Sequence, residues 1–400
     1  MKIFNSQNVF DAALDRIRYL FDEFENVVVG YSGGKDSTII LNLALQVAKE
    51  KDRLPLPVLF IDQEAEWQGT IDMVKKVMYN KDVKPYWFQI PMVMTNNASS
   101  FERYSYIWKK GAEDKFIHPL DEISIKENKY GTDRFHQLFA AIFKGEFKGT
   151  KSCYISGVRT EESPKRLMSL THNLTYKWIT WGKILDKGNE HYTFYPIYDW
   201  NYTDVWKAIH DNGWEYNRIY DEMYRHGNTI SEMRISNLHH ETAIQSLLLV
   251  QEIEPETWQK LSNRIQGANT IKHLKFDSFV CPEELPPMFE SWKEYALHLS
   301  ETIIQEQSNR DALMKKIDSC KDIYTGDEIS RIFYRTIINT ILSSDWDFTK
   351  IANFEIRQET NSYRQYKKGV YKREMIKYAK YLTMDEQIHL IDEIEKSAKN

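Results

Sequence analysis

Residues 27–38 (Val-Val-Val-Gly-Tyr-Ser-Gly-Gly-Lys-Asp-Ser-Thr) gather backbone freedom, hydroxyl groups and charge in one short segment. The run of valines predicts a strand, and the apolar spacing after Lys35 predicts a helix. Gly33 and Gly34 let the backbone turn sharply between the two and approach a ligand closely. The first N–H groups of a helix favour an anion. The segment therefore predicts a phosphate site between a strand and a helix.

The side chains of the same segment complete that chemistry. Lys35 adds a positive charge, and Asp36 carries a carboxylate that could hold Mg²⁺ on a phosphate. Hydroxyl groups of the segment add hydrogen-bond donors. The residues predicted to bind the ligand here are Tyr31, Ser32, Gly33, Gly34, Lys35, Ser37 and Thr38.

The segment Ser32-Gly33-Gly34-Lys35-Asp36-Ser37 resembles the PP-loop of the adenine nucleotide α-hydrolase superfamily. It is not a Walker P-loop, which has four residues between its first Gly and the Gly-Lys-Ser/Thr. The superfamily includes ATP pyrophosphatases, ATP sulfurylases of the small-subunit type and phosphoadenylyl-sulfate (PAPS) reductases. The resemblance implies that the loop holds the β,γ-phosphates of ATP, with chemistry at or beside the α-phosphate.

A second polar segment runs from Gly157 to Arg166, after the apolar run Cys153–Ile155. Arg159 and Arg166 carry planar guanidinium groups suited to bidentate contact with phosphate or sulfate, and Glu162 could orient one of them. The segment resembles the Gly-x-Arg-x-x-Glu-Ser-x-x-Arg motif of the PAPS reductase and ATP sulfurylase branch. The predicted catalytic residues are Lys35, Asp36, Arg159 and Arg166, and the predicted nucleotide site also includes Gly157, Glu162 and Ser163.

Tyr195–Trp206 resembles a third segment of that branch, Pro-Ile-x-Asp-Trp-x-x-x-Asp-Val-Trp. Thr203 is expected to cap the helix that follows, with Asp204 in its first turn. Tyr216–Asp221 is similar to the Tyr-Asn-x-x-Tyr loop that lies near the substrate in the family. Together with the segments below, the resemblance covers roughly residues 20–270.

Three later segments narrow the resemblance to one PAPS-reductase-like subfamily. They are Met233–Asn237, Glu254–Leu261 and Arg264–Asn269. The named member of that subfamily is immunoglobulin-binding regulator A, a proposed prophage gene co-activator that is often encoded beside a ParB-like nuclease-fold protein. The resemblance implies a partner of that kind.

Strands alternate with helices over the first part of the chain, which predicts a parallel α/β sheet with helices on both faces. Asp62 follows the expected strand Val58–Ile61 and is predicted to bind nucleotide or metal, because ligands sit at the carboxyl ends of such strands. Residues 92–150 are expected to form an insertion that shapes the substrate pocket. The expected domains are 1–230, a Rossmann-like PP-loop domain, and 231–400, which is mostly helical.

Length, net charge and hydropathy limit the classes of protein to which this chain can belong. A chain of 400 residues favours two domains. The net charge of −5 gives no overall attraction to nucleic acid. The sequence predicts no membrane span and no signal-peptide core, so a cytoplasmic location is expected.

Three cysteines, Cys153, Cys281 and Cys320, form no Cys-x-x-Cys pair. Their spacing argues against an iron–sulfur cluster and against a zinc site. PAPS reductases carry a reactive cysteine in a Glu-Cys-Gly-Leu-His context, which this sequence lacks. The reductase reaction is therefore not expected.

Residues 361–380 carry seven Lys or Arg side chains against one acid, with tyrosines interleaved. Cations for phosphates and aromatic rings for unstacked bases are what single-stranded nucleic acid binding requires. A solvated helix face is the other interpretation.

The sequence predicts an ATP-using enzyme, or an enzyme-derived nucleotide sensor, that binds ATP with Mg²⁺ and cleaves it between the α- and β-phosphates. The acceptor that becomes adenylated is left open, as is the oligomeric state. Three alternatives remain: an ATP sulfurylase, a sulfur-transfer ATPase acting on nucleic acid, and a non-catalytic regulator that binds a nucleotide.

Overall fold

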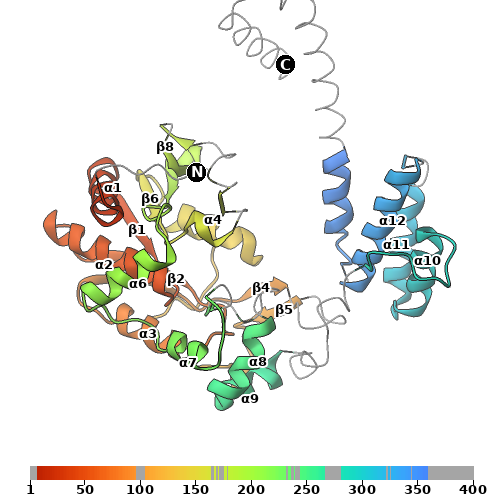
Figure 1. The fold of residues 1–400 in the computed structure, drawn as a ribbon, viewed down its shortest axis with the longest axis horizontal. Coiled ribbons are helices and arrows are strands. Elements are labelled where there is room, and N and C mark those ends of the chain that lie inside the picture. Colours follow the sequence, from red (N-terminus) through yellow and green to blue (C-terminus); the bar gives the residue numbers. More distant parts are fainter. Residues whose placement is uncertain are drawn as a thin grey trace, which may run out of the picture. The chain divides into compact units, whose positions relative to one another are not determined.

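The computed structural model describes residues 7–95, 104–163, 166–167, 170, 175–177, 179–230, 233–235, 238, 244–265, 281–320, 323–324, 326–343 and 345–358. The chain divides into two compact units, residues 1–274 and 275–400. The first is a mainly parallel α/β domain and the second is helical, so the predicted fold class is confirmed (Figure 1).

A seven-stranded sheet forms the centre of the first unit, in the order β3-β2-β1-β6-β9-β8-β7. Neighbouring strands from β3 to β9 are parallel, and β8 and β7 add an antiparallel edge. The strands are β1 (Asn26–Gly30), β2 (Leu56–Ile61), β3 (Val83–Phe88), β6 (Ser152–Ile155), β7 (Thr175–Tyr176), β8 (Ile179–Asp186) and β9 (His191–Phe194). This antiparallel edge was not predicted from the sequence.

Alternating residues of the central strands face two different hydrophobic cores, as the period of a strand requires. Val27 and Val29 of β1 join the core shared with one set of helices, whereas Val28 joins the core beneath α4. The first set is α1 (Val9–Glu23), α2 (Lys35–Glu50), α3 (Gln68–Met78) and α6 (Tyr202–Asp211), and the opposite face is covered by α4 (Phe135–Glu146). The sheet is thus the middle layer of three.

The insertion between β3 and β6 has its own structure. A two-stranded hairpin, β4 (Met92–Thr95) and β5 (Tyr104–Ile107), packs with α4 against the sheet. Between these elements lies the short 3-10 helix η1 (Glu113–Lys115), and two further ones, η2 (Thr160–Glu162) and η3 (Lys187–Asn189), follow later in the chain.

Residues beyond the predicted boundary at 230/231 still belong to the first unit. Its last helices are α7 (Ile219–Arg225), α8 (Ile244–Ile253) and α9 (Pro255–Arg264). Arg264 makes two hydrogen bonds to the buried carboxylate of Glu64, at 2.6 and 3.0 Å. Glu254 accepts from Gln68 N–H at 2.7 Å and Gly69 N–H at 3.0 Å, at the start of α3. These contacts tie α9 and its approach to the sheet domain, so the division at 274/275 falls later than predicted.

The second unit packs α10 (Trp292–Thr302), α11 (Gln307–Cys320), α12 (Asp327–Leu342) and a helix over 349–358 around an apolar core. Phe333, Ile337 and Ile338 lie at its centre. The basic segment 361–380 lies outside the described residues.

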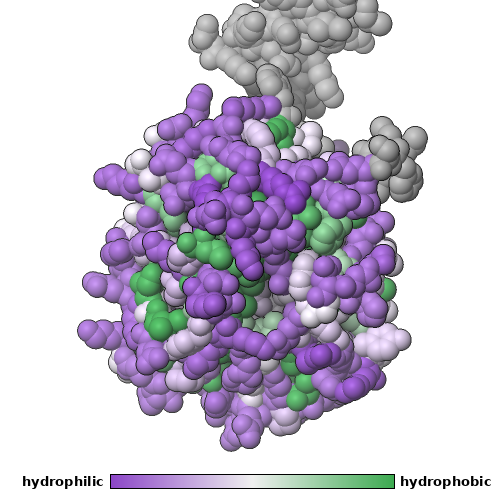
Figure 2. Space-filling model, turned by 90° about the vertical axis from the view of Figure 1, so that its left-hand side faces the viewer, coloured by the Kyte–Doolittle hydropathy of each residue, from purple (hydrophilic) through white to green (hydrophobic). Residues whose placement is uncertain are grey.

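The face drawn in Figure 2 is mainly hydrophilic, with hydrophobic residues in small, separate patches. Among the described residues, no helix has the length and hydropathy that crossing a bilayer requires.

The start of α6 differs from the sequence expectation. Asn201, not Thr203, is the N-cap residue, and the Asp204 carboxylate accepts the Asn201 N–H at 2.6 Å. Thr203 is exposed. We expect Asp204→Ala to lower the free energy of unfolding by about 1 kcal/mol, because it removes that acceptor and a favourable first-turn charge. Thr203→Ala is the matched control, and a larger loss for Thr203→Ala in urea titrations would contradict this capping geometry.

Candidate functional site

The site forms where the strand order reverses. From β1 the chain continues through α2 to β2 on one side, while β6 pairs with β1 on the other, with Val29 opposite Ile155. The loops after β1 and β6 therefore emerge side by side at the carboxyl edge of the sheet. Such a switch point is where open parallel sheets bind their ligands.

The loop after β1 has the geometry of a tight turn into a helix. Gly33 has a φ of +69°, a left-handed conformation that favours glycine, and Gly34 is the extended N-cap residue of α2. Ser37 Oγ donates to the Gly34 carbonyl at 2.9 Å and accepts the Ser32 N–H at 3.2 Å. These bonds hold the start of α2, where N–H groups lack partners inside the helix, in a fixed shape.

Glycine is required at the start of the second loop for a different reason. A Cβ atom on Gly157 would lie 2.6 Å from the backbone carbon of Asp36. The loop after β6 therefore packs directly on the first turn of α2, which brings the two sequence motifs into contact.

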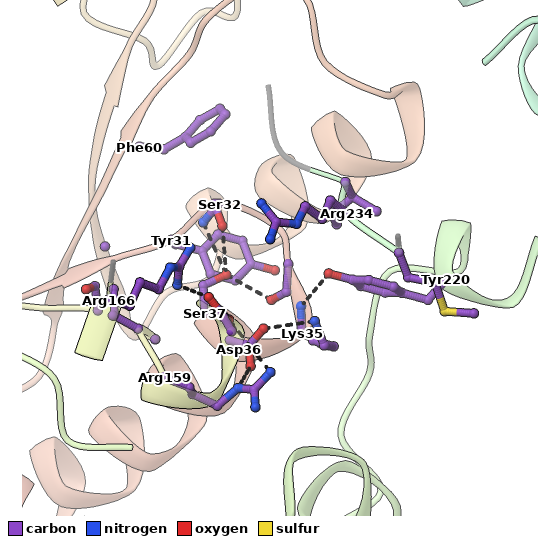
Figure 3. A pocket seen from close by; sticks show the side chains of 18 of the residues that line it. Tyr31, Ser32, Lys35, Asp36, Ser37, Phe60, Arg159, Arg166, Tyr220 and Arg234 are labelled. Carbon is purple, nitrogen blue, oxygen red and sulfur yellow. Dashed lines mark hydrogen bonds and ion pairs between the residues drawn. The ribbon is translucent and has the colours of Figure 1, made fainter. Parts of the chain in front are cut away.

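One carboxylate joins the two loops electrostatically. Asp36 Oδ1 lies 2.6 Å from Arg159 Nε, and Asp36 Oδ2 lies 3.0 Å from Lys35 Nζ (Figure 3). Arg159 also contacts Glu161 at 3.0 Å, and Arg166 pairs with Glu162. Arg159 Nη2 lies 3.7 Å from Glu162 Oε1 as well, so the four predicted catalytic residues belong to one network of charges.

Burial makes this network strong. Lys35 is 8 % exposed and Arg159 only 3 %. Burial pulls the pKa of the Lys35 ammonium down, but Tyr220 and Asp36 outweigh it and hold that pKa above its usual value. Burial raises the pKa of the Glu162 carboxyl even though Arg166 opposes the shift. Lys35 and Arg159 therefore stay charged, and their burial strengthens the attraction between these cations and an anion in the cavity.

These residues line a cavity of about 970 Å³. Its polar side carries the loop after β1, Arg159 and Arg166, whereas Leu59, Phe60 and Ile61 from the end of β2 add an apolar wall. Figure 3 shows Phe60 lying well away from Asp36 and Arg159. Phe60 therefore belongs to an apolar part of the cavity wall that lies apart from the charged network.

Tyr220 on α7 closes the cavity beside the helix start. Its hydroxyl accepts the Lys35 N–H at 3.3 Å, and Lys35 Nζ lies 5.1 Å from the centre of its ring (Figure 3). Burial raises the pKa of this hydroxyl, so it remains protonated. The loop that carries Tyr220 was predicted to lie near the substrate, but no role was predicted for Tyr220 itself.

Most of the predicted site residues meet in this cavity. Those that line it are Tyr31, Ser32, Gly34, Lys35, Asp36, Ser37, Gly157, Arg159, Glu162 and Arg166. Gly33 shapes the turn beneath it. Thr38 is buried within α2, and Ser163 accepts the Arg166 N–H at 3.0 Å, so both support the site without lining it.

Asp62 is the exception. Its carboxylate is fully buried outside the cavity wall, where Oδ2 accepts from Trp87 Nε1 at 2.9 Å and Oδ1 lies 3.2 Å from His118 Nε2. Because partners from three segments surround it, Asp62 stabilises the fold of β2, β3 and the insertion. The predicted ligand role is corrected accordingly.

The residues do not fit a resident magnesium site at Asp36, because both of its oxygens face cations. Among the described residues, no group of three His, Cys, Asp or Glu side chains is arranged to hold a metal. The three cysteines are buried with raised pKa values, and burial is the main cause in each case. None of the three lines the cavity.

Several cavity residues were not predicted individually, although the insertion 92–150 was expected to shape the pocket and contributes two of them. They come from the insertion (Phe135, Phe139), from β2 and β6 (Phe60, Tyr154), and from the segment after α7 (Thr229, Ile230, Met233, Arg234, Ile235). The segment Met233–Ile235 was noted only as part of a subfamily motif, which was the available sequence signal for it.

Two family models match the chain. A family model described as "Phosphoadenosine phosphosulfate reductase domain" matches residues 26–227. A second, described as "Domain of unknown function (DUF3440)", matches residues 227–390.

Three curated proteins illustrate what the chain is similar to. The uncharacterized protein YbdN of Escherichia coli is 28% identical, over 73% of this chain and 74% of its own length. An adenosine 5'-phosphosulfate reductase of Lysinibacillus sphaericus is 24% identical over 55% of this chain and 79% of its own. A sulfate adenylyltransferase subunit 2 of Shewanella pealeana is 25% identical over 48% of this chain, which spans 60% of that subunit. Among solved structures, a PAPS reductase from Candida auris in a phosphate complex has a TM-score of 0.33 at 15% identity, covering 60% of this chain and 99% of its own.

The close contact at Gly157 gives a direct test of this geometry. Gly157→Ala places a methyl group against the backbone of Asp36, so we expect a loss of about 1–3 kcal/mol in unfolding free energy and a displaced helix start. Gly188→Ala is the control, since its Cβ would meet nothing closer than 3.5 Å. Equal stability of the two variants in denaturant titrations would show that the two loops are not packed in this way.

Proposed function

This chain belongs to the phosphoadenosine phosphosulfate reductase domain family, and we propose that it binds ATP and cleaves it between the α- and β-phosphates to adenylate an acceptor. The observation that carries the proposal is the single cavity that combines an anion-binding helix start, two buried cations and an apolar wall. ATP has the matching division into a polyanionic end and a flat apolar base.

The polar end supports binding of the terminal phosphates. The first turn of α2 directs N–H groups and the positive end of its dipole at the cavity. Lys35 and Arg159 add charge, and Asp36 fixes the orientation of both through contacts of 3.0 and 2.6 Å. In this proposal Asp36 is a positioning residue rather than a metal ligand.

The apolar end supports binding of the adenine. Leu59, Phe60 and Ile61 at the end of β2 line the cavity, and Phe60 lies away from the charged network (Figure 3). A base held there would place the α-phosphate between the two ends, beside Arg159 and Arg166. Those guanidinium groups can stabilise the charge that develops when the α–β bond breaks.

The chain's own contribution to the reaction is positioning and charge stabilisation. Attack by an acceptor on the α-phosphate, with pyrophosphate leaving, needs in-line placement and neutralised charge rather than a protein nucleophile. The buried thiols, with pKa values above normal, favour this reaction over one that needs a reactive thiolate.

Sulfate is a second candidate acceptor. It is favoured by the similarity to sulfate adenylyltransferase subunits and by Arg166, whose guanidinium reaches the cavity and is suited to a tetrahedral anion. Pyrophosphate release that requires sulfate alone would identify this reaction. The regulatory role and the ParB-like partner rest on the subfamily resemblance and stay predictions.

Replacing Lys35 by Ala should weaken ATP binding at least about tenfold, because a buried charge-assisted contact to phosphate is lost. Arg159→Lys should also reduce pyrophosphate release, since an ammonium cannot hold Asp36 and a phosphate in the same plane. The control is Lys49→Ala, an exposed position on the same helix. Calorimetry with MgATP that gives equal affinities for Lys35→Ala and the wild type would contradict the proposal.

The triple Cys→Ser variant of Cys153, Cys281 and Cys320 should keep its ATP affinity and pyrophosphate release. We expect only a stability loss, largest at the fully buried Cys153. Thiol-dependent release of sulfite from PAPS by the wild type, abolished in this variant, would instead establish a reductase.

A further inference from the structure

A second recess opens beside the nucleotide cavity in the first unit. It has a volume of about 350 Å³, and three of its wall residues, Tyr202, Tyr220 and Met233, also line the larger cavity. The remaining walls are Trp206, Tyr216, Asp221, Tyr224 and Arg225. The two spaces therefore share one side, at the helix start that the phosphates would occupy.

Aromatic rings make up most of this recess, and they stand at steep angles to one another. The rings of Tyr216 and Tyr220 meet that of Trp206 edge-on, at 86° and 87°, with centroids 5.1 and 5.7 Å away. Tyr224 is 74% exposed, so the recess opens to solvent at its side. A flat group could enter and contact ring surfaces.

The charged groups of the recess are already engaged. Asp221 accepts from the Tyr216 hydroxyl at 2.9 Å and pairs with Arg218 at 3.2 Å. Arg225 pairs with Glu222 at 2.6 Å. Because each charge is balanced locally, the recess favours a neutral planar group with hydrogen-bonding edges over a free cation or anion.

We propose that this recess, which shares Tyr202, Tyr220 and Met233 with the nucleotide cavity, binds a nucleobase of the acceptor. The volume is within the range of small-molecule sites, and base–aromatic stacking needs no particular base. Tyr220 suits the junction, because its hydroxyl contacts the Lys35 N–H while its ring packs against Trp206. The assignment as the acceptor's subsite rests on the proposed function, whereas base binding itself does not.

The test measures base binding directly, without turnover. Four labelled homopolymeric deoxyoctamers and a labelled abasic octamer are titrated with the full-length chain by fluorescence anisotropy. We expect at least one base-bearing octamer to bind better than the abasic one, which reports contacts to the phosphate backbone alone, including any from residues 361–380. Unlabelled nucleosides as competitors then distinguish a free nucleoside from a base within a strand.

Variants of Tyr224 test whether the base binds in this recess. Tyr224→Ala should weaken the base-dependent affinity by about fivefold or more, because a stacking surface is lost, and Tyr224→Phe should restore it. Tyr106→Ala is the control: this tyrosine is 55% exposed, on β5, and lines neither cavity. No advantage of any base-bearing octamer over the abasic one, or equal losses in Tyr224→Ala and Tyr106→Ala, would overturn the proposal.

The result of the octamer-binding experiment can be distinguished from the result of the MgATP calorimetry. A wild-type chain that binds MgATP but no base would remove only this recess as a base site. A chain that binds a base through Tyr224 but no ATP would remove the proposed function and the acceptor role, and leave the base site standing. Base binding that leaves pyrophosphate release unchanged would contradict the acceptor role.

Discussion

The contact of Asp36 with Arg159 is the interaction on which the site depends. It joins the helix start after β1 to the loop after β6, two segments more than 120 residues apart in the chain. The contact exists because β1 and β6 are adjacent parallel strands and because Gly157 lets the second loop reach the backbone of Asp36. Without it, Lys35 and Arg159 would be two buried cations with a weaker balance of charge, which is costly in a protein interior.

A second set of buried ionic contacts, around Glu64, holds the elements that close the nucleotide cavity. Glu64, only 1% exposed, accepts two hydrogen bonds from Arg264 and one from the Trp108 N–H. It therefore connects the end of β2, the insertion and α9 at one point. Because Tyr220 and the segment around Ile235 belong to the same hydrophobic cluster as α9, this connection also positions the residues that close the nucleotide cavity.

The sequence predicted those features that depend on local pattern. Strand and helix periods predicted the parallel sheet, and the motif spacing identified the residues around Lys35 and Arg159. Asp62 was misjudged, because its partners Trp87 and His118 come from distant segments and no local signal shows that they enclose it. The cap of α6 was misplaced by two residues, since Asn201 and Thr203 are both good capping residues and only the backbone conformation decides between them. The predicted boundary at 230/231 lies beside residue 227, where the two family models meet, whereas the compact units divide at 274/275 because α9 packs on the sheet domain.

The central claim is that one cavity receives ATP with its terminal phosphates at the start of α2. A crystal structure with the non-hydrolysable analogue α,β-methylene-ATP tests this most directly. The account predicts β- and γ-phosphate oxygens within hydrogen-bonding distance of the first-turn N–H groups of α2 and of Lys35, with the adenine against Phe60 and Ile61. An analogue bound elsewhere, or one bound with its base at the helix start and its phosphates in solvent, would contradict it.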